Sequence, residues 1–270
     1  MNLSKWQAGP MVAIGLIVTL WGIAVPAEAQ WPRQRSKLSR TADGKVDLKA
    51  PVPRTPDGKP DLAGLWESSN EFEAPRLLLN IAADLKPGEV PLRPWAEELL
   101  KQRQANHSAN HPGARCLPSG MPEKLFVPAP FKIVQTPDLV LFLFESRTIY
   151  RQVFVDGRSL PPPDAQPTWQ GYSVGRWDKD SFVVETAGFN GETWLDMSGH
   201  PATEALRVTE RYTRRIVGQM DVEITIDDPK AYTKAWMVSH KFRLLPEDEL
   251  IEHICEENNI DPAHMIGIGK

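Results

Sequence analysis

The sequence predicts a mainly β protein: an antiparallel barrel of about eight to nine strands, an extended N-terminal arm, one short helix before the barrel and a short C-terminal helix. Three observations predict this fold. The segments beyond Pro130 alternate apolar and polar residues, turn-forming residues separate them, and no helical periodicity lies between them. A chain of 270 residues is long enough for one sizeable core.

The predicted strands rest on period-two alternation, which places successive side chains on opposite faces of a sheet. Eight segments carry this pattern: 131–136, 139–145, 147–155, 171–177, 181–187, 206–216, 219–226 and 234–245. An antiparallel meander of this number hides its edges most economically by closing into a barrel.

The other predicted elements flank these strands. Residues 30–61 are rich in proline and basic residues and contain two related stretches, TADGKVDL and TPDGKPDL, whose Asp-Gly pairs mark turns, so we expect an extended arm. Residues 62–270 form a single barrel domain, with a helix near 94–106 that begins at a proline. Short helices are also expected at 201–206 and 248–259.

The N-terminus has the pattern of a signal peptide over residues 1–29. A lone Lys5 precedes an apolar run from Met11 to Val25, and small residues at Ala27 and Ala29 suit cleavage before Gln30. The alternative is a membrane anchor, but the run is about fifteen residues, shorter than the roughly 20 that span a bilayer. We therefore expect a periplasmic or secreted protein with no membrane span after cleavage.

The two cysteines, Cys116 and Cys255, both lie in the exported part. In an oxidising compartment such a pair most simply forms one disulfide. The alternative, a nucleophilic Cys116, lacks any Cys-His signature around it.

Charge and motifs exclude several classes of protein. The formal net charge is −4 and no basic cluster occurs, which argues against nucleic acid as a partner. No nucleotide loop, nucleophile elbow or zinc-ligand cluster is present, so no cofactor or metal is expected. His107 and His111 have helical spacing, but a proline and a glycine follow at once, which favours an exposed helix end over a metal site.

Two ionisable residues fall on the apolar face of their strands, Glu210 and His240. Because an isolated buried charge is costly, each needs a partner or a shifted pKa. If the strand 219–226 lies between theirs, the two groups sit roughly 10 Å apart. They are candidate proton-transfer groups in one pocket, with Tyr150 or Arg151 holding a developing oxyanion. The alternative is two core polar groups with separate partners.

The connection after residue 187 carries Trp194, Asp196 and His200. A connection this long would lie at a barrel mouth, where ligand-gating loops are found. His200, held by Asp196, is a further candidate for proton transfer. It could equally be an exposed loop histidine.

Two stretches of sequence suggest relatives. DLAGLW, residues 61–66, resembles the Gly-x-Trp signature of lipocalins, which implies that Trp66 closes one end of a lipocalin-like barrel. The resemblance also implies that a basic residue of the last strand, here Arg243, pairs with the indole. More broadly, RCLPSGMP, YRQVFVDGR and GYSVGRWDKDSFVVETAGFN, within residues 55–260, resemble a family of exported bacterial proteins with no assigned activity. That resemblance implies export and β structure.

These observations predict a binding protein whose barrel holds an apolar or aromatic small molecule. The residues expected to line its site are Tyr150, Arg151, Trp194, Tyr212 and Trp236. One alternative is a cofactor-independent lyase, hydratase or isomerase that uses Glu210, His240 or His200 as acid or base. A second alternative, suggested by the arm, is a partner protein in an envelope complex.

Overall fold

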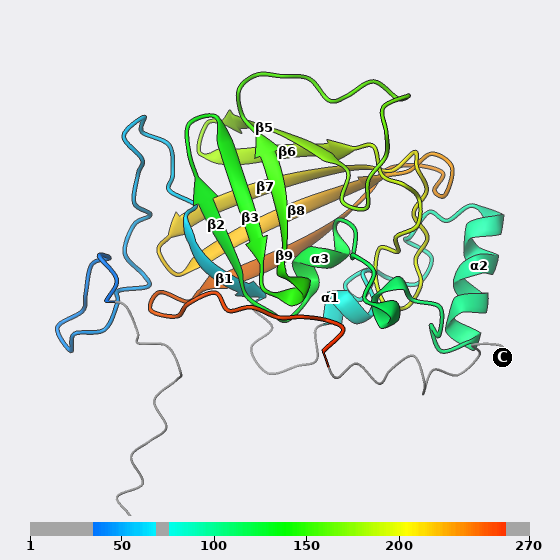
Figure 1. The fold of residues 1–270 in the computed structure, drawn as a ribbon, viewed down its shortest axis with the longest axis horizontal. Coiled ribbons are helices and arrows are strands. Elements are labelled where there is room, and N and C mark those ends of the chain that lie inside the picture. The colour runs from blue at the N-terminus through cyan, green and yellow to red at the C-terminus, as the bar shows by residue number, and fades with distance from the viewer. Residues whose placement is uncertain (1–34, 69–75, 258–270) are drawn as a thin grey trace, which may run out of the picture. The chain divides into compact units, whose positions relative to one another are not determined.

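The computed structural model describes residues 35–68 and 76–257. Within these residues nine strands form one closed barrel in sequence order, and the first strand pairs with the last (Figure 1). The strands are β1 (Gly64–Ser68), β2 (Phe131–Gln135), β3 (Leu139–Phe144), β4 (Ile149–Phe154), β5 (Tyr172–Asp178), β6 (Ser181–Ala187), β7 (Arg207–Ile216), β8 (Gln219–Asp227) and β9 (Trp236–Leu244). The predicted barrel and its strands are confirmed.

The helical segments are short and lie mostly between β1 and β2. They are α1 (Arg76–Leu79), α2 (Pro94–Ala105), the 3₁₀ turn η1 (Pro112–Arg115), α3 (Glu123–Phe126) and the 3₁₀ turn η2 (Ser146–Thr148). Figure 1 shows α1, α2 and α3 gathered at one end of the barrel, which we call the helical end. No helix in the described part of the chain has the length and apolar character needed to cross a membrane.

One strand pair departs from the predicted antiparallel meander. β4 and β5 are parallel, with Val153 opposite Ser173 and Phe154 opposite Val174. The connection 155–171 explains this, because it carries the chain back along the barrel before β5 begins (Figure 1). Parallel neighbours need such a crossover, whereas antiparallel neighbours need only a short turn. The expectation of antiparallel pairing is therefore wrong at this seam.

Aromatic side chains pack the barrel interior. Phe131 lies 5.0 Å from Phe242 and 6.0 Å from Phe142, measured between ring centroids. All four residues of α3 are buried, and the ring of Phe126 packs edge-on against His240 at 5.4 Å. The helix thus inserts side chains into the helical end, and this part of the interior is occupied by the protein's own side chains.

The opposite end is closed by Trp66, as the Gly-x-Trp resemblance implies. The indole is fully buried and donates to Leu62 O at 3.0 Å. Gly64 has φ +144°, and a Cβ there would meet Leu244 at 2.6 Å, so this position requires glycine. The basic partner is Arg214 of β7, whose guanidinium lies 4.7 Å from the indole centroid.

The expectation that Arg243 supplies this partner is wrong. Alternation along β9 buries Phe242 and Leu244, so the side chain between them faces outward. Arg243 is half exposed there and pairs with Glu67. Arg214 falls on the inward face of β7 and is buried.

The described part of the arm, residues 35–61, is extended and bonded to the closed end of the barrel. Val52 N donates to Arg215 O at 3.3 Å, and Gly218 N donates to Leu48 O at 2.8 Å. Arg54 forms a salt bridge with Asp180 in the β5–β6 turn. Residues 1–29 and the first residues of the arm lie outside the described part of the chain.

Two helix expectations are wrong and one is misplaced. Residues 201–206 form no helix, because the backbone N–H of Thr203 bonds to Asp228 Oδ2 at 2.7 Å instead. The tail 248–257 is also non-helical, and its backbone bonds to the β3–β4 connection, with His253 N donating to Thr148 Oγ1. α2 has the predicted position in the sequence, but it follows β1 rather than preceding the barrel.

The predicted disulfide is confirmed. Cys116 and Cys255 are bonded, with 5.6 Å between their Cα atoms. The bridge ties the tail that follows β9 to the segment after η1 at the helical end.

Candidate functional site

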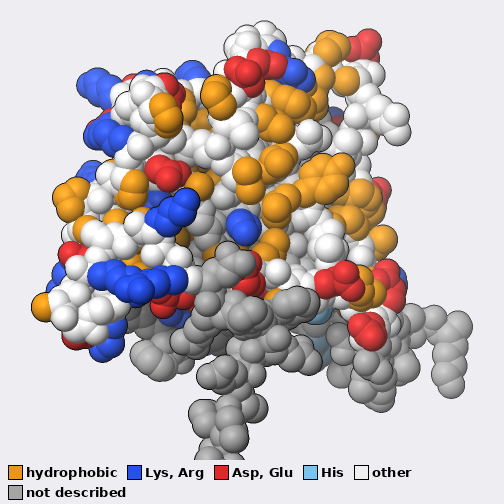
Figure 2. All heavy atoms as spheres, turned by 60° about the vertical axis from the view of Figure 1, so that its left-hand side comes forward, with side chains coloured by type: hydrophobic (Ala, Val, Ile, Leu, Met, Phe, Trp, Pro, Cys, Tyr) orange, Lys and Arg blue, Asp and Glu red, His pale blue; other side chains and the backbone are white. Residues whose placement is uncertain are grey.

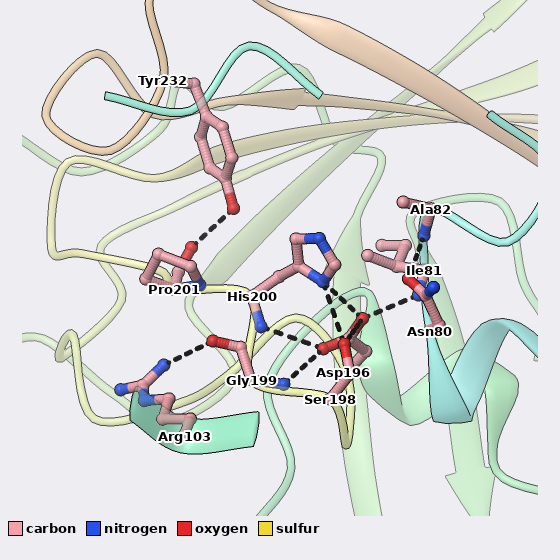
Figure 3. Close-up of polar contacts among 10 residues, drawn as sticks. All are labelled: Asn80, Ile81, Ala82, Arg103, Asp196, Ser198, Gly199, His200, Pro201 and Tyr232. Carbon is pink, nitrogen blue, oxygen red and sulfur yellow. Dashed lines mark hydrogen bonds and ion pairs between the residues drawn. The ribbon is translucent and has the colours of Figure 1, made fainter. Parts of the chain in front are cut away.

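The connection between β6 and β7 carries Asp196, whose carboxylate organises the helical end (Figure 3). The carboxylate accepts hydrogen bonds from the backbone N–H groups of Ile81 at 2.7 Å, Gly199 at 2.9 Å and His200 at 3.0 Å. His200 Nδ1 lies 2.6 Å from Oδ2, and the Ser198 hydroxyl donates to the same oxygen. Asp196 is fully buried and joins its own loop to the segment after α1.

The predicted pairing of Asp196 with His200 is thus present. Burial raises the pKa of Asp196, but the hydrogen bond and the charge of His200 outweigh it, and the pKa lies below its ordinary value. An ionised carboxylate only accepts, so Nδ1 is the donor and Nε2 is the ring nitrogen that Asp196 does not engage. No hydrogen-bond partner of Nε2 is found in the described part of the chain. The arrangement suits proton transfer, and the same bonds also fix the loop.

Trp194 lies beside this pair and packs between two polar groups. The guanidinium carbon of Arg103, from α2, is 4.0 Å from the indole centroid, and the arginine donates to Gly199 O at 3.0 Å (Figure 3). The ring of His111 meets Trp194 edge-on at 5.0 Å. Burial lowers the pKa of Arg103 to about 10, so the group remains charged at neutral pH.

A row of polar side chains crosses the barrel interior behind the β4–β5 seam. Arg151 donates to Ser173 Oγ at 2.9 Å, to Thr186 Oγ1 at 2.7 Å and to Glu210 Oε1 at 3.2 Å. These partners come from β5, β6 and β7 respectively. Burial raises the pKa of Glu210, and the Arg151 charge opposes that rise. The row links β4 to the strands beyond the seam.

His240 has a different partner from Glu210. Its Nε2 lies 2.8 Å from the hydroxyl of Ser68 on β1. Burial lowers the pKa of His240 to about 4, so the ring is neutral at neutral pH. Glu210 and His240 both point inward, as alternation predicts, but they bond to different strands: Glu210 to Arg151 of β4 and His240 to Ser68 of β1. Neither is bonded to His200.

A groove of about 510 Å³ lies along the β4–β5 seam. Aromatic and aliphatic side chains dominate its wall, while Arg151 and Ser173 reach it from inside the barrel. The lining residues are Pro118, Thr148, Ile149, Tyr150, Arg151, Gln152, Phe154, Thr168, Trp169, Gln170, Gly171, Tyr172 and Ser173. Tyr150 is 64% exposed, and Phe154 stacks on Tyr172 with centroids 5.2 Å apart. A concave aromatic wall with a few convergent polar groups is typical of small-molecule sites.

The surface around the seam is apolar as well. The outward residues Leu141 and Leu143 of β3 lie opposite Gln152 and Tyr150 of β4, and Leu139 lies opposite Phe154. Figure 2 shows hydrophobic side chains gathered over the right-hand part of one face, whereas Lys and Arg lie mainly to its left. Contiguous exposed apolar surface of this kind marks interaction sites.

A second hollow of about 610 Å³ lies between α2 and the loops of the helical end. We call it the α2 cavity. Its lining is more polar than the groove and contains Arg103 and Arg115 with Glu192. The other lining residues are Leu99, Gln102, Asn106, Ser108, Ala109, Asn110, Pro112, Leu117, Trp169, Gly191 and Trp194. Trp169 thus belongs to both hollows.

The predicted ligand-binding residues divide among three places. Tyr150 and Arg151 line the groove, and Trp194 lines the α2 cavity. Tyr212 and Trp236 are buried within the barrel. Alternation indicated which side chains face inward, but it could not indicate the hollows at the outer surface.

Sequence reasoning missed Trp169, Tyr172 and Arg115. One available signal was Trp169 itself, a large aromatic residue in a connection rich in proline, where a core position is not expected. Arg115 had no such signal, because one arginine in a loop is ordinary.

Among the described residues, no group of three or more His, Cys, Asp and Glu side chains is placed to hold a metal ion. Comparison of the chain with family models, curated proteins and solved structures finds no match.

Proposed function

We propose that this protein is an exported small-molecule-binding protein whose site is the groove along the β4–β5 seam, and that its ligand is apolar or aromatic. The observation that carries the proposal is the groove itself: about 510 Å³, with Tyr150, Phe154 and Tyr172 forming an aromatic wall. That size suits a small organic molecule. The disulfide fits export, since such bonds persist in oxidising compartments.

The electrostatics of the groove also support an uncharged or apolar body. Arg151 reaches the floor, but its charge is matched by Glu210 at 2.8 Å and its other donors are taken by Ser173 and Thr186. A ligand in the groove therefore meets a neutral polar floor rather than a free cation. Burial of apolar ligand surface against the aromatic wall supplies the affinity, about 25 cal/mol per Å².

A binding protein is supported better than the lyase, hydratase or isomerase alternative. Glu210, His240 and His200 have separate hydrogen-bond partners, whereas proton transfer needs an acid and a base that converge on one reacting atom. The Asp196–His200 pair keeps the geometry of a proton-transfer pair, but the lining of neither the groove nor the α2 cavity includes it.

The test is a fluorescence titration with N-phenylnaphthylamine, a neutral aromatic probe. We expect saturable binding, and we expect Tyr150→Ala and Phe154→Ala each to weaken it by about tenfold, because each removes apolar contact worth roughly 1.5 kcal/mol. Met237→Ala is the matched control: this side chain is apolar and half exposed on β9, outside the groove. If the probe fails to bind, or if the groove variants behave like the control, the proposal is wrong.

A further inference from the structure

The groove and the α2 cavity are neighbours that share one side chain. Trp169 lines both hollows, and the chain passes from one lining to the other between Leu117, in the α2 cavity, and Pro118, in the groove. A ligand that fills the groove therefore reaches, across the indole of Trp169, a second compartment of comparable size.

The two compartments differ in chemistry. The groove is walled by aromatic and aliphatic side chains, whereas the α2 cavity presents the amides of Asn106 and Asn110 and two guanidinium groups. The charged residues of this lining are Arg103, Arg115 and Glu192, which give two positive charges and one negative charge. The charged side chains of the lining thus leave an excess of positive charge.

Arg115 is the cation available to a ligand. Arg103 is committed to Trp194 and to Gly199 O, and Arg158, which covers Phe154 at the edge of the seam, is bound to Asp156. In contrast, no carboxylate in the described part of the chain pairs with Arg115, whose exposed side chain lines the α2 cavity. A guanidinium that lines a cavity without a counter-ion favours an anionic ligand group, which it can bind bidentately.

Resting on the function proposed above, we propose that the ligand is an amphipathic carboxylic acid: an aromatic or acyl body in the groove, and a carboxylate that Arg115 binds in the α2 cavity. The carboxylate accepts from the guanidinium and from the neighbouring asparagine amides. Trp169 lies along the connecting part of the molecule. No covalent chemistry is required.

The test compares dansyl-undecanoic acid with its methyl ester, which has the same body and no charge. We expect the acid to bind wild-type protein up to about fivefold more tightly than the ester, since an ion pair at an exposed arginine contributes up to about 1 kcal/mol. Arg115→Gln should remove this difference by weakening the acid and leaving the ester unchanged. Arg115→Lys should keep part of it, because the charge remains without the bidentate geometry.

Arg215→Gln is the matched control, because it makes the same change in charge at an exposed position near the closed end of β7. It should leave the acid and the ester unaffected. Added salt should weaken the acid more than the ester in wild-type protein, and this measurement needs no variant.

The outcomes separate the two proposals. If the ester and N-phenylnaphthylamine bind but the acid is no tighter, or if Arg115→Gln leaves the acid unaffected, the carboxylate inference is wrong and the groove stands. If none of the three probes binds, the proposed function itself is wrong.

Discussion

Arg151 and Glu210 are charged residues inside a barrel, and their energetics follow from their mutual dependence. Both are almost fully buried, and the arginine also satisfies two hydroxyl groups. Each charge loses its hydration on folding. The attraction between the two charges offsets most of this desolvation cost. The pair therefore contributes little net stability, whereas either residue alone would be strongly unfavourable.

We expect Arg151→Met to lower the free energy of unfolding by about 3–5 kcal/mol at neutral pH, because it leaves Glu210 buried without a counter-charge. Burial already raises the pKa of this carboxyl above its ordinary 4.5, and loss of the arginine raises it further. The folded protein then binds this proton more tightly than the unfolded chain does. The destabilisation therefore grows as the pH rises above 4.5, the ordinary pKa of the carboxyl. Urea unfolding followed by tryptophan fluorescence measures both effects.

The double variant Arg151→Met/Glu210→Leu provides the control. With both charges gone and similar volumes retained, it should recover most of the lost stability. A double variant as unstable as the single one would mean that the hydroxyl partners, rather than the unpaired carboxylate, dominate the effect.

At the scale of single elements, alternation along a strand decides which arginine meets Trp66. β9 turns Arg243 outward, while β7 turns Arg214 inward onto the indole. Arg214 also donates to Val217 O at 2.7 Å and to Asp61 O, so it satisfies carbonyl groups at the closed end. Its burial lowers its pKa to about 10, which leaves it charged at neutral pH.

Arg214→Met should therefore lower the free energy of unfolding by roughly 2–3 kcal/mol, because it leaves these carbonyls buried without a donor. Arg243→Met removes an ion pair with Glu67 in which the arginine is half exposed, and it should change stability by about 1 kcal/mol, less than Arg214→Met. Equal losses in thermal or urea unfolding of the two variants would contradict this assignment.

The connections show where sequence patterns stop being informative. The helix at Pro94 follows from its proline and its spacing, and it forms as predicted. The helix expected from Pro201 does not form, because Asp228 binds the backbone and side chain of Thr203. That contact joins residues far apart in the chain, so local propensity could not reveal it.

At the scale of the whole molecule, the disulfide links two positions that are far apart in the sequence. Cys116 and Cys255 are separated by 139 positions, and the bridge ties the tail to the segment after η1. The tail also bonds separately to the β3–β4 connection. A cross-link of this span removes much of the conformational freedom of the unfolded chain, which the chain-entropy model values at roughly 5 kcal/mol.

Replacing both cysteines with serine should lower the free energy of unfolding by up to about 5 kcal/mol. A reducing agent should lower the urea midpoint of the wild-type protein to a similar extent and leave that of the double variant unchanged. A wild-type midpoint that is insensitive to reductant under complete reduction would show that the tail is held by its other contacts.

The sequence by itself determined the strands, the closed barrel, the indole at one end and the pairing of the two cysteines. The strands and the barrel follow from local alternation, from turn residues and from the need to cover sheet edges. The Gly-x-Trp resemblance implied the indole, and the presence of two cysteines in a segment expected to be exported implied the disulfide. The sequence also indicated that Glu210 and His240 face inward and that Asp196 accompanies His200.

Only the tertiary structure decided how these parts meet. The parallel seam between β4 and β5, the choice of Arg214 over Arg243, and the two hollows at Trp169 all depend on register and on long connections. Period-two alternation gives the face of each side chain but not its neighbour on another strand. The candidate site is formed by such neighbours, so it becomes visible only once the barrel has closed.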